Sequence, residues 1–327
     1  MVTDLITMKD AEFFQAVYRR GLALMSRGVA AQKVLFALPN EKRPLSHLDI
    51  MSVLAVLPSI RKDAINRYIR SGKDFSIATT GILSWVIANA ASEFSHSEKI
   101  EIEEYFTKLE EGFDGKINSR GLLDLGDSYD WSGQSRRGIL IENQAYYAKI
   151  LDLLSLLTND DIYAFKKKRL IRSVREKLDG AYVLDRADSL EMTINPFLAA
   201  FFAPELFRKE DWEKTFDSLL KSENLWIFWG GLRTLSQSDE NFIAARNGES
   251  WFFINNIVAI VLYRLNLEKY RGFINKIILA SSKNINWQEH AGRPCELVMT
   301  TGNKIRLKDF CSLTLATYIY LYRSIAL

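Results

Sequence analysis

Residue types suited to binding polyhydroxylated molecules gather in three long segments of this chain. The segments are GFDGKINSRGLLDLGDSYDWSGQSRRG (112–138), ENLWIFWGGLRTLSQSDENFIAARNGES (223–250) and NINWQEHAGRPCELVMTTGNKI (284–305). Each combines Trp with Arg, Gly and at least one of Asp and Glu. Carboxylates and guanidinium groups bind hydroxyls, and the flat face of an indole accepts the C–H face of a sugar ring. The composition of these segments therefore indicates a carbohydrate ligand.

The elements that must position these segments are helices, because apolar residues recur at helical spacing along most of the chain. After the first helix, segments with one charged face alternate with segments that are apolar on most sides. A helix that is apolar nearly all round is buried, and one with a charged face lies at the surface. The pattern predicts an all-α fold, an (α/α)6 barrel, as a single domain over 1–327. The twelve expected helices are 9–28, 45–57, 60–71, 77–94, 97–112, 138–157, 159–178, 191–203, 209–221, 249–265, 267–282 and 307–325.

The connections between these helices differ in length in a regular way. Connections from an inner to an outer helix are short, as at Pro58 and Ser59. Connections from an outer to an inner helix are long, over about 113–137, 179–190, 222–248 and 283–306. Long loops in a compact fold are usually functional. We therefore expect the active face at the N-terminal ends of the inner helices.

Composition excludes several classes of protein. The 17 glycines and 6 prolines are about 7% of the 327 residues, against about 12% in an average chain, which disfavours a sheet-rich fold. A net charge of +3 gives no case for nucleic acid or an anionic membrane as a partner. Cys295 and Cys311 are too few for a disulfide framework or a structural zinc site. We expect a cytoplasmic protein without a membrane span, a metal or a cofactor.

Four segments, in chain order, carry a family resemblance. They are SRRGILIENQAYYAKIL (135–151), GLRTLS (231–236), NGESWFFINNIVAI (247–260) and WQEHAGRPCEL (287–297). They resemble motifs of the C-terminal domain of glycogen debranching enzymes, the amylo-α-1,6-glucosidase domain, which belongs to the six-hairpin glycosidases. GLRTLS is similar to that family's G-x-R-T-L-S segment, for example. The resemblance implies the (α/α)6 fold that the helix pattern predicts independently.

The resemblance also implies an inverting glycoside hydrolase with two carboxyl groups. One protonates the leaving oxygen and the other activates water on the opposite face of the ring, at a separation of roughly 6.5–9.5 Å. The family's acid is an aspartate in T-W-M-D, where this chain has DSYDW, so the acid would be Asp130, with Asp127 as the alternative. The family's base corresponds to Glu296. The substrate-facing residues implied by the matching segments are Trp131, Glu142, Arg233, Trp251 and His290, with Asp49 as a further equivalent.

Each of these residues also has a structural interpretation. Asp130 could cap a turn, Glu296 could pair with Arg293, and Arg233 could hold its own loop by bonding backbone carbonyls. Glu142 lies on an apolar inner helix, where a lone buried carboxylate is costly. It therefore needs a cation, such as Arg136 or Arg137, or a ligand hydroxyl.

The chain also departs from the family pattern. Where debranching enzymes have W-G-R-D, this chain has LSHLDIM and keeps only Asp49. Ile77–Thr80 and Cys311–Thr314 replace two further family segments. These changes leave two hypotheses open. The first is a hydrolase of α-glucosidic or related linkages, and the second is a catalytically silent barrel that binds carbohydrate or another subunit.

Overall fold

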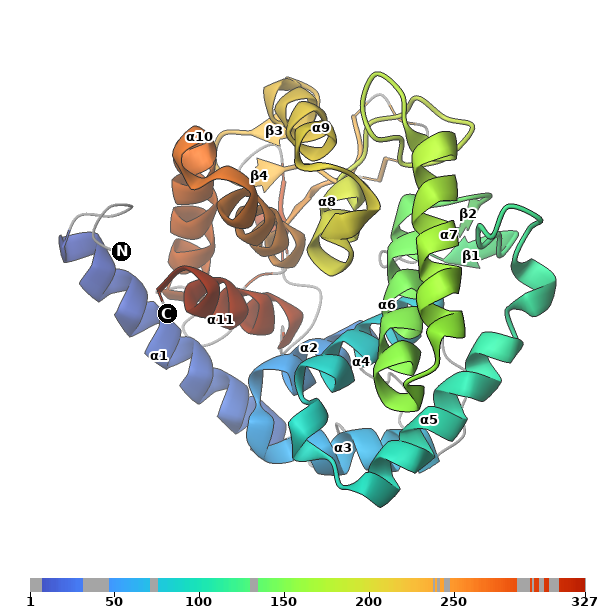
Figure 1. Ribbon diagram of the computed structural model, residues 1–327. Coiled ribbons are helices and arrows are strands. Elements are labelled where there is room, and N and C mark those ends of the chain that lie inside the picture. The colour runs from blue at the N-terminus through green and yellow to red at the C-terminus, as the bar shows by residue number, and fades with distance from the viewer. Residues whose placement is uncertain are drawn as a thin grey trace. The chain divides into compact units, whose positions relative to one another are not determined.

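Helices make up most of the secondary structure of the computed structural model, and the strands are two or three residues long (Figure 1). The structure describes residues 8–31, 47–70, 76–129, 135–237, 239, 242–243, 248–286, 295, 297–299, 303–305 and 312–326. Two compact units contain these residues. The split unit comprises residues 1–45 and 216–327, and the continuous unit comprises residues 46–215. None of the helices in the described ranges is long and apolar enough to cross a membrane.

The continuous unit alternates buried and amphipathic helices, as the sequence pattern predicts. Every residue of α8 is buried, and so are most residues of α4 and α6. The helices between them bury one stripe each and carry their charges on the other side. The helices of this unit are α2 (His47–Val56), α3 (Pro58–Arg70), α4 (Ile77–Asn89), α5 (His96–Glu111), α6 (Ile141–Thr158), α7 (Asp161–Leu178), α8 (Asn195–Phe202) and the start of α9 (Lys209–Lys221).

The buried helices α4 and α6 touch at their backbones. A Cβ added at Gly81 would lie 2.6 Å from the Cα of Tyr146. The contact therefore requires glycine, because no rotamer change can move a backbone atom away. This close approach fixes the position of α6 along the axis of α4, and with it the position of the first turn of α6.

Local sequence sets the helix ends. The helix expected to start at residue 97 begins at His96 in the structure, with Ser95 as its N-cap in a capping box. Glu98 N–H donates to Ser95 Oγ at 3.3 Å, and Ser95 N–H donates to the Glu98 carboxylate at 2.7 Å. Two amides that the helix leaves unpaired are thus satisfied reciprocally. Asp160 caps α7 as expected, accepting from Ile162 N–H at 2.8 Å.

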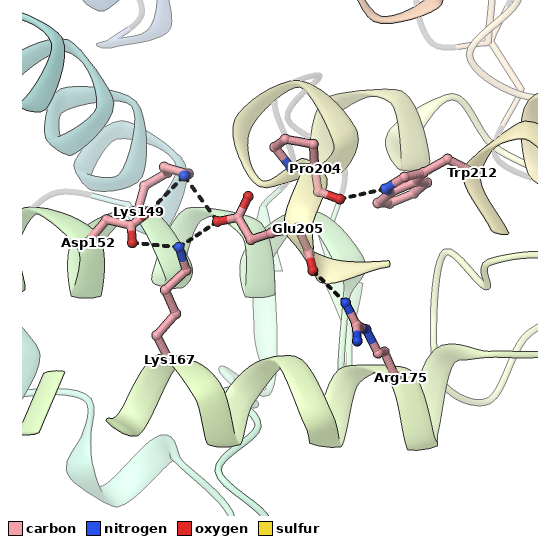
Figure 2. Close-up of polar contacts among 7 residues, drawn as sticks. All are labelled: Lys149, Asp152, Lys167, Arg175, Pro204, Glu205 and Trp212. Carbon is pink, nitrogen blue, oxygen red and sulfur yellow. Dashed lines mark hydrogen bonds and ion pairs between the residues drawn. The ribbon is translucent and has the colours of Figure 1, made fainter. Parts of the chain in front are cut away.

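An ion-pair network closes the corner between α6, α7 and the short 3-10 helix η4 (Pro204–Leu206), as Figure 2 shows. Lys149 donates to Asp152 at 2.7 Å and to Glu205 at 3.2 Å. Lys167 lies 2.6 Å from the same Glu205 oxygen. Two cations and two carboxylates therefore balance one another in a partly buried place.

The same corner is held by bonds to backbone carbonyls (Figure 2). Arg175 on α7 donates to the carbonyls of Glu205 and Leu206, both at 2.9 Å. The indole of Trp212 on α9 donates to the carbonyl of Pro204 at 2.8 Å. The carbonyls left unpaired at a helix end are satisfied in this way, and η4 is fixed to both neighbouring helices.

The split unit pairs the first and last helices of the chain. It contains α1 (Met8–Ala31), the rest of α9, α10 (Phe252–Asn286) and α11 (Ser312–Ala326). The rings of Tyr18 and Tyr322 stack with centroids 4.5 Å apart. Helix α10 is broken at Asn266, whose φ of −165° and ψ of 89° are not helical. The break lies between the two helices expected at 249–265 and 267–282, and Asn266 Oδ1 caps the second half by accepting from Lys269 N–H at 3.2 Å.

The strands belong to the long connections rather than to a core. In the continuous unit β1 (Asp127–Tyr129) pairs antiparallel with β2 (Ser135–Arg137). In the split unit β3 (Trp226–Ile227) pairs with β4 (Gly231–Leu232). There β5 (Ser250–Trp251), β6 (Leu297–Val298) and β7 (Lys304–Ile305) also form a three-stranded antiparallel sheet. These strands fix the loops that precede the buried helices.

Candidate functional site

Two long loops of the continuous unit meet at the first turn of α6. Ile141 N–H donates to the carbonyl of Asp185 at 3.0 Å, and Ala187 N–H donates to the carbonyl of Ile139 at 3.2 Å. The segments 139–141 and 185–187 therefore run side by side as a short antiparallel pair. This pairing brings Asp185, which comes from the loop between α7 and α8, next to the start of α6.

Arg136 joins two buried carboxylates at this place. One arm of its guanidinium donates to Glu142 and the other arm to Asp185, and both carboxylate side chains are less than 5% exposed. The cation expected for Glu142 is therefore Arg136. Formally the three groups carry one net negative charge. We call Arg136, Glu142 and Asp185 the ionic junction.

Asp127 and Arg137 form a separate, exposed pair across the β1–β2 hairpin. The hydrogen bond from Arg137 lowers the pKa of the Asp127 carboxyl below its ordinary value. A general acid must keep its proton near neutral pH and so needs a raised pKa. The pairing with Arg137 therefore favours Asp130 over Asp127, the alternative acid suggested by the sequence, for that role.

Four of the predicted site residues lie outside the described residues, namely Asp130, Trp131, His290 and Glu296. Asp49 lies in α2, but its side chain is also outside the described part. The structure therefore describes the neighbours of these residues rather than the residues themselves. Glu142, Arg233 and Trp251 are described with their side chains. That all the predicted residues border one cleft stays a prediction.

The chain neighbours of Glu296 are held on both sides within the split unit. Asn284, near the end of α10, accepts from Cys295 N–H at 3.0 Å and donates to the Cys295 carbonyl at 2.8 Å. On the other side Leu297 pairs with Trp251 across β5 and β6. Cys295 itself is a buried packing residue, as expected. Both flanks of the predicted base are thus fixed by backbone hydrogen bonds.

The same kind of bonding holds two other loop residues. Asn255, at the start of α10, accepts from Leu232 N–H at 2.8 Å and donates to the Leu232 carbonyl at 3.0 Å. Gln144, at the start of α6, accepts from Leu123 N–H at 2.9 Å and donates to the Leu123 carbonyl at 2.8 Å. We call each such arrangement an amide clamp: a side-chain amide that bonds both backbone groups of one loop residue. Each clamp provides hydrogen-bond partners for a backbone N–H and a C=O, which would destabilise the fold if they were buried without partners.

Arg233 and Trp251 have mainly structural surroundings. Arg233 is buried and donates to the carbonyl of Asn224 at 2.7 Å, so it holds its own loop, as one of the two interpretations predicted. Burial lowers the pKa of its guanidinium, and the charge of nearby Glu249 opposes that effect. Trp251 is partly buried and its ring meets Phe253 edge to face with centroids 6.1 Å apart.

Sequence reasoning missed Asp185 and the amide clamps. Asp185 reaches Arg136 only because two distant loops pair, and nothing in its local sequence indicates that. A polar amide on a buried helix face is a usable signal, since such a group requires partners. Asn255 and Asn256 occur as such a pair in a run that is otherwise apolar.

Comparison with solved structures shows the fold. A glycosidase variant determined in complex with glucose matches with a TM-score of 0.71 at 10% identity, covering 98% of this chain and 99% of that one. A D-mannose isomerase matches with a TM-score of 0.63 at 13% identity, covering 96% of this chain and 97% of that one. The Hormoconis resinae glucoamylase matches with a TM-score of 0.60 at 9% identity, covering 86% of this chain and 64% of that one.

No protein-family model matches the chain, and no curated protein matches it in sequence. At identities this low the structural likeness establishes the fold alone. The chain has an all-α fold of the (α/α)6 glycosidase type, which confirms the fold class expected from the alternation of helices.

Proposed function

We propose that the protein is a glycoside hydrolase that cleaves an α-glucosidic or related linkage with inversion. The observation that carries the proposal is the likeness, over nearly the whole chain, to a glycosidase that was determined with glucose bound. The four segments that resemble the debranching-enzyme domain support it independently. They also make that branch of the six-hairpin glycosidases our proposed family.

In this proposal Asp130 is the general acid that protonates the glycosidic oxygen. Glu296 is the general base that takes a proton from the attacking water. A base of this kind must be held within about half an ångström of its working position. The clamp on Cys295 and the β5–β6 pairing at Leu297 are the sort of support that such a position requires.

The other predicted residues take supporting roles. Trp131, Trp251, His290 and Asp49 are proposed to contact the sugar. Glu142 belongs to the ionic junction, and we assign it the role of positioning the loop that contains Asp130. Arg233 is likewise assigned to positioning, since its guanidinium donates to a carbonyl of its own loop.

The test is hydrolysis of α-linked glucose oligosaccharides by the full chain, with the anomer of the product followed by NMR. Asp130→Asn and Glu296→Gln should each lower kcat by about a thousandfold or more while leaving sugar affinity nearly unchanged. Asp127→Asn is the matched control, three residues from Asp130, and should keep the parent's turnover. Equal hydrolysis by the parent and Asp130→Asn would overturn the mechanism.

A second function is favoured by the match to D-mannose isomerase. The same fold can act on a free sugar, in which case no glycosidic bond breaks. Interconversion of a free aldose and ketose by the parent, without cleavage of any oligosaccharide, would select this function. Sugar binding without either reaction would select the catalytically silent barrel.

A further inference from the structure

The turn between β3 and β4 carries two large aromatic side chains in place of the usual turn residues. Gly230 N–H donates to the carbonyl of Ile227 at 3.2 Å, which closes a four-residue turn with Phe228 and Trp229 at its centre. Central turn positions are dominated by Gly, Pro, Asn, Asp and Ser. Phe228 is 69% exposed and Trp229 is 49% exposed. Aromatic carbon is thus presented to solvent at a place where local folding does not require it.

The base of this turn is rigid because the two following glycines are packed against the core. A Cβ on Gly230 would lie 2.3 Å from the Val298 side chain, and one on Gly231 would lie 2.3 Å from Asn255 Oδ1. The carbonyl of Gly230 also accepts from Ser250 Oγ at 2.6 Å. The hairpin therefore lies directly on β6 and on the start of α10, with its tip held in place.

The orientation of the Trp229 ring is fixed as well. Its indole N–H donates to the carbonyl of Met299 at 3.3 Å, and Met299 follows β6, three positions after Glu296. The ammonium of Lys276 lies 4.7 Å from the centre of the Phe228 ring. A preset ring and a nearby donor for hydroxyl groups are the two features that a sugar-stacking site combines.

The size of the turn favours a sugar over a protein partner. Two aromatic side chains offer at most about 500 Å² of contact area, whereas a stable protein interface takes about 800 Å² from each partner. A single pyranose ring matches an exposed indole in area. Its C–H face is apolar and its hydroxyl edge stays in water or meets the lysine.

We propose that Trp229 is a stacking platform that binds one sugar ring of an oligosaccharide substrate and so determines preference for longer chains. The proposal rests on the proposed function, because it takes the ligand to be the carbohydrate on which the protein acts. Trp229 lies beside the segment of the predicted base, so the platform serves a ring near the cleaved bond rather than a remote site.

The experiment compares the full-length parent with Trp229→Ala and Trp229→Phe. Calorimetry gives Kd for isomaltotriose, maltotetraose and glucose. Trp229→Ala should weaken binding of the better oligosaccharide by about tenfold, the loss expected for one aromatic stack, and should leave glucose affinity unchanged. Trp229→Phe should restore most of the loss. Ile243→Ala is the matched control, since Ile243 is equally exposed, at 49%, in the same long connection.

The outcomes separate the two proposals. If the parent binds neither oligosaccharide, the proposed function fails and this inference fails with it. If the parent binds and Trp229→Ala binds equally well, the platform is overturned while the proposed function stands. A change in the mass of the particle in light scattering, with unchanged sugar affinity, would show that the turn contacts protein and would also overturn the platform.

Discussion

The continuous unit and the split unit hold their long connections by different chemistry. In the split unit the amides of Asn255 and Asn284 clamp Leu232 and Cys295. In the continuous unit Gln144 makes a similar clamp, but the two paired loops are also joined by the ionic junction around Arg136. A neutral side-chain amide has one acceptor and one donor group, which match the N–H and C=O of one residue. A buried carboxylate instead requires a charge of opposite sign.

The difference shows how much stability each arrangement loses when one partner is removed. Removing an amide clamp leaves two polar groups unpaired, and the cost is that of two lost hydrogen bonds. Removing the guanidinium leaves two buried negative charges beside each other, and charge burial without a partner is far more costly. The ionic junction should therefore be the less replaceable of the two.

The largest effect is expected from Arg136→Met. Because Glu142 and Asp185 lose their shared cation, the free energy of unfolding should fall by about 3–5 kcal/mol. Urea unfolding followed by circular dichroism measures this loss. Arg137→Met, which breaks the exposed pair with Asp127 on the same hairpin, should leave the unfolding midpoint unchanged. Equal stability of the two variants would contradict the importance given to the junction.

A smaller effect is expected from Asn255→Ala, which unpairs both backbone groups of Leu232. The free energy of unfolding should fall by about 2–4 kcal/mol, and the Leu232 amide should lose its protection in hydrogen exchange. Thr317→Ala provides a comparison on a buried face of α11, where the lost hydroxyl donates to carbonyls of its own helix and accepts from the Asn256 side chain at 3.1 Å, so no loop peptide group loses its partner. Retained protection at Leu232 would show that the clamp is dispensable.

Asn255→Asp tests the difference between amide clamps and charged contacts directly, because it places an ionisable group where the protein has a neutral amide. Burial and the facing carbonyls should raise the pKa of that aspartate above its ordinary value of about 3.9. A raised pKa in the folded state favours folding at low pH, so the variant should be closest to the parent below about pH 4. Its deficit should grow as pH rises through the raised pKa. A pH-independent deficit would argue against burial of the group.

The smallest effect concerns Glu205 in the network of Figure 2. Burial by itself would raise the pKa of Glu205, but Lys149 and Lys167 together hold it below the ordinary 4.5. The associated stability is present above pH 4.5 and is lost as pH falls through the lowered pKa. Glu205→Gln should therefore cost about 1 kcal/mol or less at pH 7, and this cost should shrink as pH falls through the lowered pKa of Glu205. Glu104→Gln, which removes a charge on the exposed side of α5, is the control.

The fold followed from the sequence because hydrophobic periodicity reports burial directly. The helix expected at 209–221 has those bounds in the structure, and the break in α10 falls between two expected helices. The helix expected at 97–112 begins at His96 instead, because Ser95 and Ser97 both precede the same charged run and either could cap it. Only the reciprocal bond with Glu98 distinguishes them.

The sequence predicted the contacts of the candidate site only where a buried charge required a partner. A carboxylate on a buried helix requires a cation, so a partner for Glu142 could be predicted. The second carboxylate, Asp185, lies 49 positions from Arg136 and has no periodic pattern around it. The sequence also gave no indication of the exposed Phe228–Trp229 turn. These two side chains are exposed because Gly230 and Gly231 pack against the core, and that packing is seen only in the structure.

The pairing of α1 with α11 has a consequence for synthesis on the ribosome. Tyr18 and Arg323 are 305 positions apart and bond directly, so α1 leaves the ribosome long before its partner α11 is made. Residues 46–215 are complete long before that moment and can form their own contacts as they emerge, since folding during synthesis proceeds from the N-terminus. Until then the apolar stripe of α1, with Phe14 and Val17, remains uncovered. That stripe is covered once α11 has been synthesised and packs against α1.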